Sequence, residues 1–328
     1  MELSVIIVNW NSSEYLKNCL SRLYANLSDV TFEVIVVDNA SYDGCGEMLR
    51  SEFPNVEFIQ APENLGFAAA NNLGFARSSG DYLLFLNPDT EVIGSAVNVM
   101  LSNLKVLPNA GAVGCRLINS DGSLQIPCIQ PFPTILNQVL DTEYLIHRFP
   151  RLRIWGVTPL FYYRGTPDTV EVISGACLMV KSEVFRAVGM FSPEYFMYGE
   201  DLDLCYRIAR AGFRAYYVGE ATVIHHGGAS TKRNKIDHFN TVAKRESIAL
   251  FFRKHRGKGR AFSYRYSMLG VSILRLFILA TFFPAGIVVR RGGSLAYAFA
   301  KWSKVLSWSL GFEERALSFR GHKASSVG

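Results

Sequence analysis

The sequence lacks several patterns that would assign it to a common protein class. Its six cysteines form no CxxC pair, which argues against a zinc finger and against a disulfide-rich scaffold. No GxGxxG follows the first apolar run and no GxxxxGK[ST] occurs, so neither a dinucleotide dehydrogenase nor a P-loop nucleotidase is supported. No low-complexity tract or fixed-period repeat interrupts the 328 residues. With 49% hydrophobic and only 19% charged residues, the chain is expected to fold as one large or two smaller compact domains.

Charge is scarce but unevenly distributed. The formal net charge of +6 suits an anionic partner, which could be a nucleic acid, a phosphorylated substrate or a membrane surface. The basic residues gather directly before the most apolar stretch, at Arg253, Lys254, Arg256, Lys258, Arg260 and Arg265. This placement favours a membrane surface over nucleic acid. The first residues, MELSVIIVNWN, show no basic region and no cleavage site, so we expect no signal peptide and a cytosolic protein body.

The first hundred residues alternate between two kinds of segment. Short apolar runs rich in β-branched residues predict strands at 3–9, 32–38, 56–60 and 81–87. The stretches between them can form helices near 13–26, 43–52 and 66–78. Apolar strands joined by helical crossovers indicate a parallel sheet that is covered on both faces. The fold class predicted is therefore α/β, with a doubly wound, mostly parallel sheet.

The second hundred residues are less regular. Prolines mark loops over a lid or acceptor-facing surface, at Pro127, Pro131, Pro133, Pro150, Pro159 and Pro167. Beyond them we expect a buried strand at 170–180, a helix at 200–211 that Gly212 ends, and short strands at 213–218 and 221–226.

The C-terminal region is the most apolar. Its uncharged segment 276–289 is shorter than the roughly 20 residues of a membrane-spanning helix, unless Arg275 lies within a longer segment. Segment 295–310 repeats large apolar residues at helical spacing and contains Trp302, as interfacial helices often do. Interfacial attachment, a true span and an ordinary packed helix all stay open.

Polar residues follow the predicted strands. Ligands of parallel sheets bind at the carboxyl ends of strands, where this chain places Asn9, Asn11, Asp38, Asn39, Asn87 and Asp89. Asn64 and Asn71 surround the start of a helix at Gly66, where backbone N–H groups and side-chain amides could hold a nucleotide or sugar. Each feature has a structural alternative: a turn after Pro88, or a helix cap at Asn64.

Seven blocks occur in an order that resembles a known family. They are VIIVNWN, VIVVDNAS, ENLGFAAANN, YLLFLNPDTEV, ISGACLMVK, YGEDLDLCYR and HHGGAS. Together they are similar to the family 2 glycosyltransferases of the GT-A fold, especially to the rhamnosyltransferase-like branch that builds polysaccharide on a polyprenyl lipid. The resemblance covers about residues 3–230 and implies transfer of a sugar with inversion at its anomeric carbon.

The resemblance also implies a catalytic base. The family's acidic pair matches Glu200 and Asp201, and we expect Asp201 to take the proton of the acceptor hydroxyl. The alternative is that these acids only stabilise the positive end of a helix dipole. Asp203 lies four residues before Arg207, the spacing of an ordinary structural ion pair worth a few tenths of a kcal/mol.

By the same resemblance Asp89 would bind a divalent cation, Mn²⁺ or Mg²⁺. The family's first acidic position is Asn87 in this chain, which weakens the metal site. His225 is the better match to the family's histidine ligand, and an imidazole ligand favours Mn²⁺; His226 reads as a hydrogen-bonded residue at a strand end. For the nucleotide, the resemblance places Asp38 against a pyrimidine ring and Asn9 and Asn11 near base and ribose. The other expected nucleotide-binding residues are Asn39, Asn64, Gly66, Asn71 and Asn87.

These inferences combine into one expectation. The chain would transfer a sugar from a nucleoside diphosphate sugar, best dTDP-L-rhamnose, to a polyprenyl-diphosphate-linked or polysaccharide acceptor at the cytosolic membrane face, with no nucleic acid partner. Residues 1–250 would form the transferase domain, with 1–105 binding nucleotide and 106–250 facing the acceptor, and 251–328 a membrane-associating helical region. The alternatives are an inactive scaffold that binds nucleotide sugar, and a sugar-phosphate nucleotidyltransferase.

Overall fold

The structure is a computed structural model that describes residues 1–125, 128–140, 148–149, 152, 165–227, 239–288 and 292–312. The loop prolines Pro127, Pro150 and Pro159, and the last residues of the predicted C-terminal region, lie outside the described residues. The chain divides into two compact units. The first comprises Met1–Phe132, Ile146–Phe196 and Glu200–Arg233, and the second comprises Pro133–Leu145, Met197–Gly199 and Asn234–Gly328.

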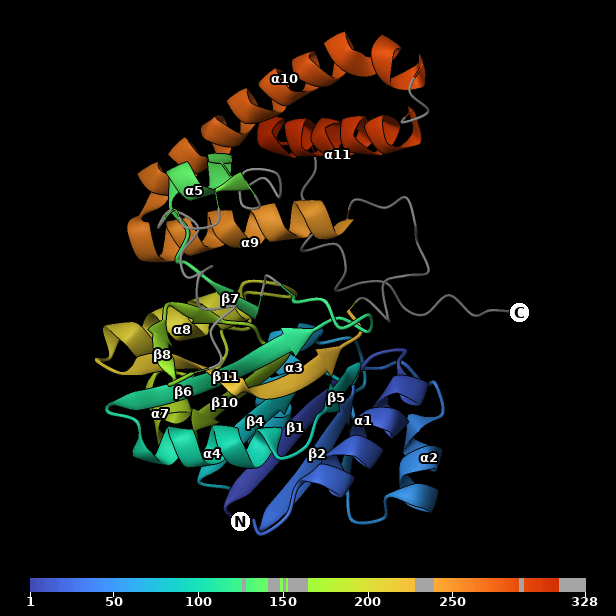
Figure 1. The fold of residues 1–328 in the computed structure, drawn as a ribbon, viewed down its shortest axis with the longest axis vertical. Helices are drawn as coiled ribbons and strands as arrows, with labels where there is room; N and C mark the ends of the chain where they lie inside the picture. Colours follow the sequence, from blue (N-terminus) through green and yellow to red (C-terminus); the bar gives the residue numbers. More distant parts are fainter. Residues whose placement is uncertain are drawn as a thin grey trace. The chain divides into compact units, whose positions relative to one another are not determined.

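A large mixed sheet forms the centre of the first unit (Figure 1). Its strands run in the order β3-β2-β1-β4-β10-β6-β11-β5, and β8 pairs with β11. Their bounds are β1 Leu3–Asn9, β2 Phe32–Asp38, β3 Glu57–Gln60, β4 Tyr82–Leu86, β5 Thr90–Val92, β6 Ala110–Ile118, β8 Asp168–Val170, β10 Cys177–Lys181 and β11 Arg214–His225. A separate small sheet pairs β7 (Ile129–Gln130) with β9 (Val172–Ile173). The predicted α/β class with a mostly parallel sheet is confirmed.

The strands are apolar because helices cover both faces of the sheet. Every residue of β1 is buried, as a central strand of a parallel sheet requires. The helices of this unit are α1 Ser13–Asn26, α2 Cys45–Glu52, α3 Gly66–Phe75, α4 Ala96–Val106, α7 Ser182–Ala187 and α8 Glu200–Arg210. In α1 the buried residues Leu16, Cys19, Leu20 and Leu23 recur at helical spacing, which gives this helix a single apolar face.

Two segments differ from the expected elements. Segment 170–180 is not one strand: Val170 ends β8, which pairs with β11, and residues 174–176 separate β9 from β10. Strand β10 enters the large sheet antiparallel to β4 and β6. Segments 213–218 and 221–226 are instead one long strand, β11, whose pairing with β6 shifts register between Val218 and Thr222. Such a shift inserts extra residues while the strand continues.

The ion pair of Asp203 and Arg207 is more deeply buried than its spacing suggested. Asp203 is fully buried, and its Oδ2 lies 2.7 Å from Arg207 Nε and 2.7 Å from the Ser192 hydroxyl that donates to it. Arg207 also donates to the carbonyl oxygens of Val188 and Met190. This pair connects α8 to the loop before it, and removing one partner would leave a buried charge unpaired, at a cost of about 3–5 kcal/mol.

The second unit is helical. Its helices are α5 Ile135–Leu140, α9 Phe239–Arg256, α10 Lys258–Val288 and α11 Gly292–Leu310. Their core is a cluster that includes Tyr264, Met268, Trp302, Val305 and Trp308. Arg275 faces this core: its guanidinium carbon lies 4.1 Å from the Trp302 ring centroid. Within the described residues no helix is long and apolar enough to cross a bilayer.

Candidate active site

The sheet topology brings the expected site residues to one edge. Strands β1, β2, β4, β6 and β11 run in the same direction, so their carboxyl ends share that edge. Because β10 is antiparallel, with Cys177 opposite Leu86, its amino-terminal end reaches the same place. Asn9, Asp38, Asn87, the 174–176 segment and His225 all lie at these strand ends. This is where ligands of such sheets bind.

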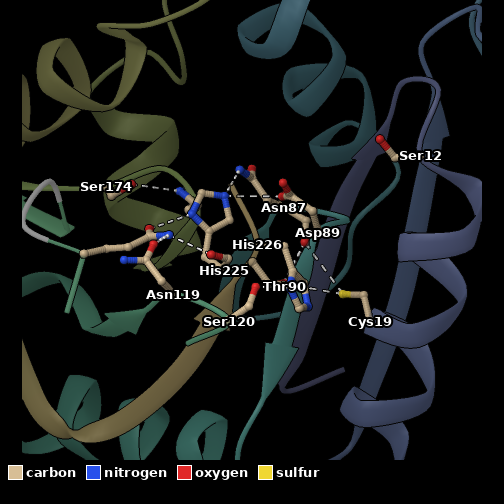
Figure 2. A network of polar contacts seen from close by, with 12 residues as sticks. Ser12, Cys19, Asn87, Asp89, Thr90, Asn119, Ser120, Ser174, His225 and His226 are labelled. Atoms are coloured by element: carbon tan, nitrogen blue, oxygen red, sulfur yellow. Dashed lines mark hydrogen bonds and ion pairs between the residues drawn. The ribbon is translucent and has the colours of Figure 1, made fainter. Parts of the chain in front are cut away.

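Asp89 and His225 are in contact, although they lie far apart in the sequence. Figure 2 shows the side chains of Asn87 and Asp89 beside the imidazole ring of His225. The Nε2 atom of His225 lies 3.3 Å from Asp89 Oδ1 and 3.3 Å from Asn87 Nδ2. The three side chains are largely buried or half-buried. A carboxylate and an imidazole nitrogen at this separation can both bind one divalent cation.

Gln125 determines which nitrogen of His225 carries the proton. The Gln125 amide nitrogen donates to the His225 carbonyl oxygen at 2.6 Å and to Asn119 Oδ1 at 2.8 Å. Its amide oxygen therefore faces His225 Nδ1, at 2.8 Å. An amide oxygen only accepts, so Nδ1 carries a proton, and Nε2, on the side of Asp89, is the nitrogen that could bind a cation. The oxygen of Asp89 and the nitrogen of His225 thus fit a divalent cation. Gln125 orients the His225 ring.

His226 belongs to a different set of contacts. Its Nε2 lies 2.9 Å from Glu91 Oε1, and its Nδ1 lies 2.7 Å from the Ser120 hydroxyl. Glu91 also pairs with Arg22 at 3.2 Å. With both ring nitrogens occupied, His226 is the hydrogen-bonded strand-end residue that the sequence predicts.

Asp201 is held at the start of α8 by two backbone N–H groups. Its Oδ2 accepts from the Gly175 N–H at 3.0 Å, and its Oδ1 accepts from the Leu202 N–H at 2.7 Å. The neighbouring Glu200 is buried, and its Oε2 has no hydrogen-bond partner in the described part of the chain. Burial, and then the charge of Asp201, raise the pKa of Glu200 well above its ordinary value. Burial therefore disfavours the charged form of Glu200, whereas the carboxylate of Asp201 accepts two backbone N–H groups.

The segment 174–176 connects the two groups of acids. Gly175 donates its N–H to Asp201, and the next residue, Ala176, accepts from the Asn87 N–H at 2.9 Å. A Cβ atom at Gly175 would lie 3.5 Å from the Asp201 Cβ, which is an ordinary van der Waals contact. One short backbone segment is thus hydrogen-bonded on one side to Asp201 and on the other to the strand end that carries Asn87 and Asp89.

The first two strand ends form a second polar group. Asn9 is fully buried, and its Nδ2 donates to Asp38 Oδ1 at 2.9 Å and to Asp43 Oδ1 at 3.1 Å. Although burial opposes ionisation of Asp38, hydrogen bonds from Ser41, Gln60 and Asn9 hold its pKa below the ordinary value. Asp38 is thus an ionised hydrogen-bond acceptor at the end of β2. Asn9 is one of the donors that hold its carboxylate in place. Asn11 is exposed, with a positive φ of 52°.

Asp38, Asp43 and Cys45 also place possible metal ligands within 4.8 Å of one another. The hydrogen bonds of this group argue against a cation there. Asp38 accepts from the donors just described, and Asp43 Oδ2 accepts from the Ser13 N–H at 2.9 Å. Burial, and then the charges of Asp38 and Asp43, raise the pKa of the Cys45 thiol, so it stays protonated and a poor ligand. The group organises the loop between β2 and α2.

The asparagines near α3 mainly bind the protein's own backbone. Asn39 Nδ2 donates to Asn64 Oδ1 at 2.8 Å, and Asn64 Oδ1 accepts from the Gly66 N–H at 3.0 Å. This fixes the turn before α3, although the N-cap residue of α3 is Leu65 and no side chain caps the helix. Asn71 is buried and donates to the Phe67 carbonyl oxygen one turn earlier at 2.9 Å. Their amides shape the wall of the candidate nucleotide site, whereas their part in binding stays a prediction.

Gly66 is a position where only glycine fits. Its φ is +78°, and a Cβ atom would lie 2.5 Å from the Phe196 carbonyl oxygen. We expect Gly66→Ala to lower the free energy of unfolding by about 2–4 kcal/mol, because it adds overpacking to backbone strain. Urea denaturation measures this. Gly122→Ala is the matched control, since Gly122 has a φ of +81° and open space around it; equal losses for both would contradict the packing explanation.

Sequence reasoning missed three residues of this edge. Gln125 follows an irregular loop, Asp43 reads as the first residue of an Asp-Gly turn, and Gly175 lies inside what looked like a continuous strand. For Asp43, the only local signal was its place five residues after Asp38. The contact of Gln125 with His225 spans 100 residues, so no local pattern could have revealed it.

Comparisons with known proteins identify the family of the chain. The chain is 29% identical over 287 residues to the N-acetylglucosaminyl-diphospho-decaprenol L-rhamnosyltransferase of Mycobacterium tuberculosis, covering 83% of this chain and 91% of that protein. It is 26% identical over 231 residues to the rhamnosyltransferase WbbL of Escherichia coli, covering 68% and 82%.

Solved structures support the fold. The mannosyltransferase PcManGT of Pyrobaculum calidifontis, solved with GDP-Man and Mn²⁺, superposes with a TM-score of 0.59 at 17% identity, covering 95% of this chain and 86% of that one. GalNAc-T7, solved with UDP, GalNAc and Mn²⁺, gives 0.52 at 14% identity, covering 69% and 44%. The sequence model described as Glycosyl transferase family 2 matches residues 4–189, more than half of the chain. The protein therefore belongs to glycosyl transferase family 2.

Proposed function

We propose that this glycosyltransferase is inverting and metal-dependent. In this proposal it moves a sugar, best L-rhamnose from its dTDP derivative, to a lipid-linked or polysaccharide acceptor of the cell envelope. The single observation that carries the proposal is the 174–176 segment, which binds Asp201 on one side and the Asn87–Asp89 strand end on the other. A base and a diphosphate site must flank one sugar for in-line displacement. The two rhamnosyltransferase relatives supply the choice of donor and acceptor class.

The reaction would proceed in one displacement. The acceptor hydroxyl forms a bond to the anomeric carbon while the bond from that carbon to the diphosphate oxygen breaks. The hydroxyl proton passes to the Asp201 carboxylate, and the nucleoside diphosphate leaves with the bonding electron pair. The neighbouring Glu200, whose pKa is raised by burial, would lie beside this base.

Asp89 and His225 would hold the divalent cation. A bound cation would neutralise charge on the diphosphate as it leaves. Solved structures of the same fold contain Mn²⁺, and an imidazole ligand favours Mn²⁺ over Mg²⁺. Asp38 would accept the ring N–H of a pyrimidine base, beside Asn9, Asn11 and the turn at Gly66.

The C-terminal region, residues 251–328 in the domain division that we propose, would attach the enzyme peripherally to the cytoplasmic side of the plasma membrane. The clustered basic residues before the apolar helix α10 support this placement.

Transfer of radiolabelled rhamnose from dTDP-rhamnose to a polyprenyl-diphosphate-linked N-acetylglucosamine acceptor tests the proposal. Counts in the lipid fraction are the expected result, and UDP-sugars in parallel reactions test the donor. Binding of nucleotide sugar without turnover on any acceptor would favour the inactive scaffold instead. Release of pyrophosphate from a nucleoside triphosphate would favour a nucleotidyltransferase.

Gln125 offers a test of the cation site that does not depend on activity. We expect Gln125→Leu to weaken Mn²⁺ binding in the presence of nucleoside diphosphate by about 10- to 100-fold, because His225 loses the acceptor that orients its ring. Electron paramagnetic resonance of free Mn²⁺ measures this. Gln125→Glu keeps an acceptor for Nδ1 but loses the donor to the His225 carbonyl oxygen, so it is expected to bind Mn²⁺ more tightly than Gln125→Leu and less tightly than wild type. Unchanged affinity in Gln125→Leu would show that His225 is not a ligand.

A further inference from the structure

Helix α10 has two different faces. One packs in the core of the second unit through Tyr264, Met268 and Ser272, all fully buried. The other face carries large apolar side chains that are between 44% and 67% exposed, at Phe262, Tyr266, Ile273, Leu274, Phe277 and Ile278. These six residues, called here the outer face of α10, recur at intervals that return to one side of a helix. An exposed apolar stripe of this length marks an interaction surface.

The arginines within α10 do not interrupt the outer face, because they turn toward the core. Arg265 donates to the Trp308 carbonyl oxygen at 2.7 Å and to that of Ser309 at 3.2 Å. Arg275 lies against the Trp302 ring and donates to the Val139 carbonyl oxygen at 3.4 Å. The side chains of both arginines thus bind groups of their own unit, and the outer face from Phe262 to Ile278 carries no charged residue.

Every Asp, Glu, Lys or Arg residue between Ser247 and Phe312 is basic. No aspartate or glutamate occurs between Glu246 and Glu313. At the end of α9 and the start of α10, directly before the outer face, the exposed residues include Arg253, Lys254, Arg256, Lys258 and Arg260. A surface that combines a cationic cluster with aromatic and aliphatic side chains complements an anionic lipid headgroup layer above acyl chains.

We propose that the outer face of α10 lies in the interface of an anionic bilayer, with the basic cluster at the lipid phosphates. This specifies the membrane attachment included in the proposed function. A second copy of the chain is a poorer occupant, because pairing two such faces would leave both basic clusters without an anionic partner. The helix would lie in the membrane plane, since interfacial helices bury one apolar face and keep the other against protein or water.

Flotation of the purified full-length protein with vesicles tests this surface. We expect binding to vesicles of 70% phosphatidylcholine and 30% phosphatidylglycerol, and weak binding to pure phosphatidylcholine. The double substitution Ile273→Gln, Phe277→Gln should reduce the partition coefficient at least about tenfold, since both exposed side chains lose their apolar surface. Lys258→Gln with Arg260→Gln should reduce it about thirtyfold at low salt. Wild-type flotation of the Ile273 and Phe277 variant would overturn the proposal.

Matched controls separate this surface from a general effect. Val106→Gln removes a comparably exposed apolar side chain from α4 and should float like wild type. The Ile273 and Phe277 variant should still transfer sugar to a detergent-solubilised acceptor, because neither residue belongs to the candidate active site. If this variant no longer floats but still transfers sugar, the outer face is needed for membrane binding and not for catalysis. If the wild-type protein floats but transfers no sugar, the proposed function is wrong while the membrane surface stands.

A fluorescent label distinguishes lipid from a protein partner. The six native cysteines are buried, so a new cysteine from Phe277→Cys can be labelled selectively with an environment-sensitive dye. Anionic vesicles should shift its emission to the blue, while the same dye at Val106→Cys should not respond. A blue shift that instead follows protein concentration without vesicles, together with a doubled mass in light scattering, would assign the outer face to a dimer and overturn the proposal.

Discussion

Replacing Asp201 by asparagine is expected to lower the rate of sugar transfer by about 10²- to 10⁴-fold while nucleotide-sugar binding stays near wild type. The two carboxylate oxygens accept from the N–H groups of Gly175 and Leu202. An asparagine keeps the shape, but its amide nitrogen cannot accept, so it loses one of these two bonds together with the ability to take a proton. Turnover with radiolabelled donor gives the rate, and isothermal titration calorimetry gives the affinity for the donor.

Glu183→Gln is the matched control for Asp201→Asn. Glu183 is an exposed acid in the first turn of α7, so it has the same favourable relation to a helix dipole without any contact to the candidate site. If Asp201→Asn kept normal turnover, or if both variants lost the same modest amount, Asp201 would be structural and the base would have to be sought elsewhere. A thermal unfolding curve for each variant verifies that it is folded.

Asp89→Asn is expected to reduce transfer by about 10²-fold or more, and EDTA is expected to stop transfer by the wild-type protein. Asp89 supplies the only carboxylate within contact distance of His225 Nε2 among the described residues, so removing its charge leaves a cation held mainly by imidazole and diphosphate. Transfer assays across a Mn²⁺ titration should show that the variant needs far more metal than wild type.

Glu91→Gln provides the comparison for Asp89→Asn. Glu91 lies two residues further along the chain, but it pairs with Arg22 and His226 and not with His225. Its variant should keep transfer within a few-fold of wild type at every metal concentration. Full activity of the wild-type protein in EDTA would remove the cation role from Asp89 and His225 together.

The sequence predicted the parts of the fold that follow from local patterns. Strands β1 and β2 begin and end at the expected residues, because runs of β-branched apolar residues bounded by polar ones have few other stable arrangements. The meeting of Asp89 with His225 was also predictable, through family resemblance rather than through spacing. The predicted roles of Asp201, Asp38 and the asparagines stay predictions that the experiments above address.

Long-range packing explains what the sequence could not reveal. The antiparallel direction of β10 in the sheet depends on its pairing with strands near residues 84 and 113. No pattern within the strand itself encodes this direction. The burial of Glu200 and of the Asp203–Arg207 pair comes from elements packed around α8, whereas their helical spacing looks like that of an exposed turn. Gln125 illustrates the same limit, since its partner is a ring and carbonyl a hundred residues later.

The position of β10 has a consequence for the order in which the enzyme matures. This strand is hydrogen-bonded to β4 on one side and to β6 on the other, and it is made later than both. While the nascent chain emerges from the ribosome, β1 to β4 can pair with one another, but β4 and β6 are joined only after β10, which ends at residue 181, has left the exit tunnel. Such non-local pairing is slow, so assembly of the catalytic edge should be a late, post-collapse step of biosynthesis.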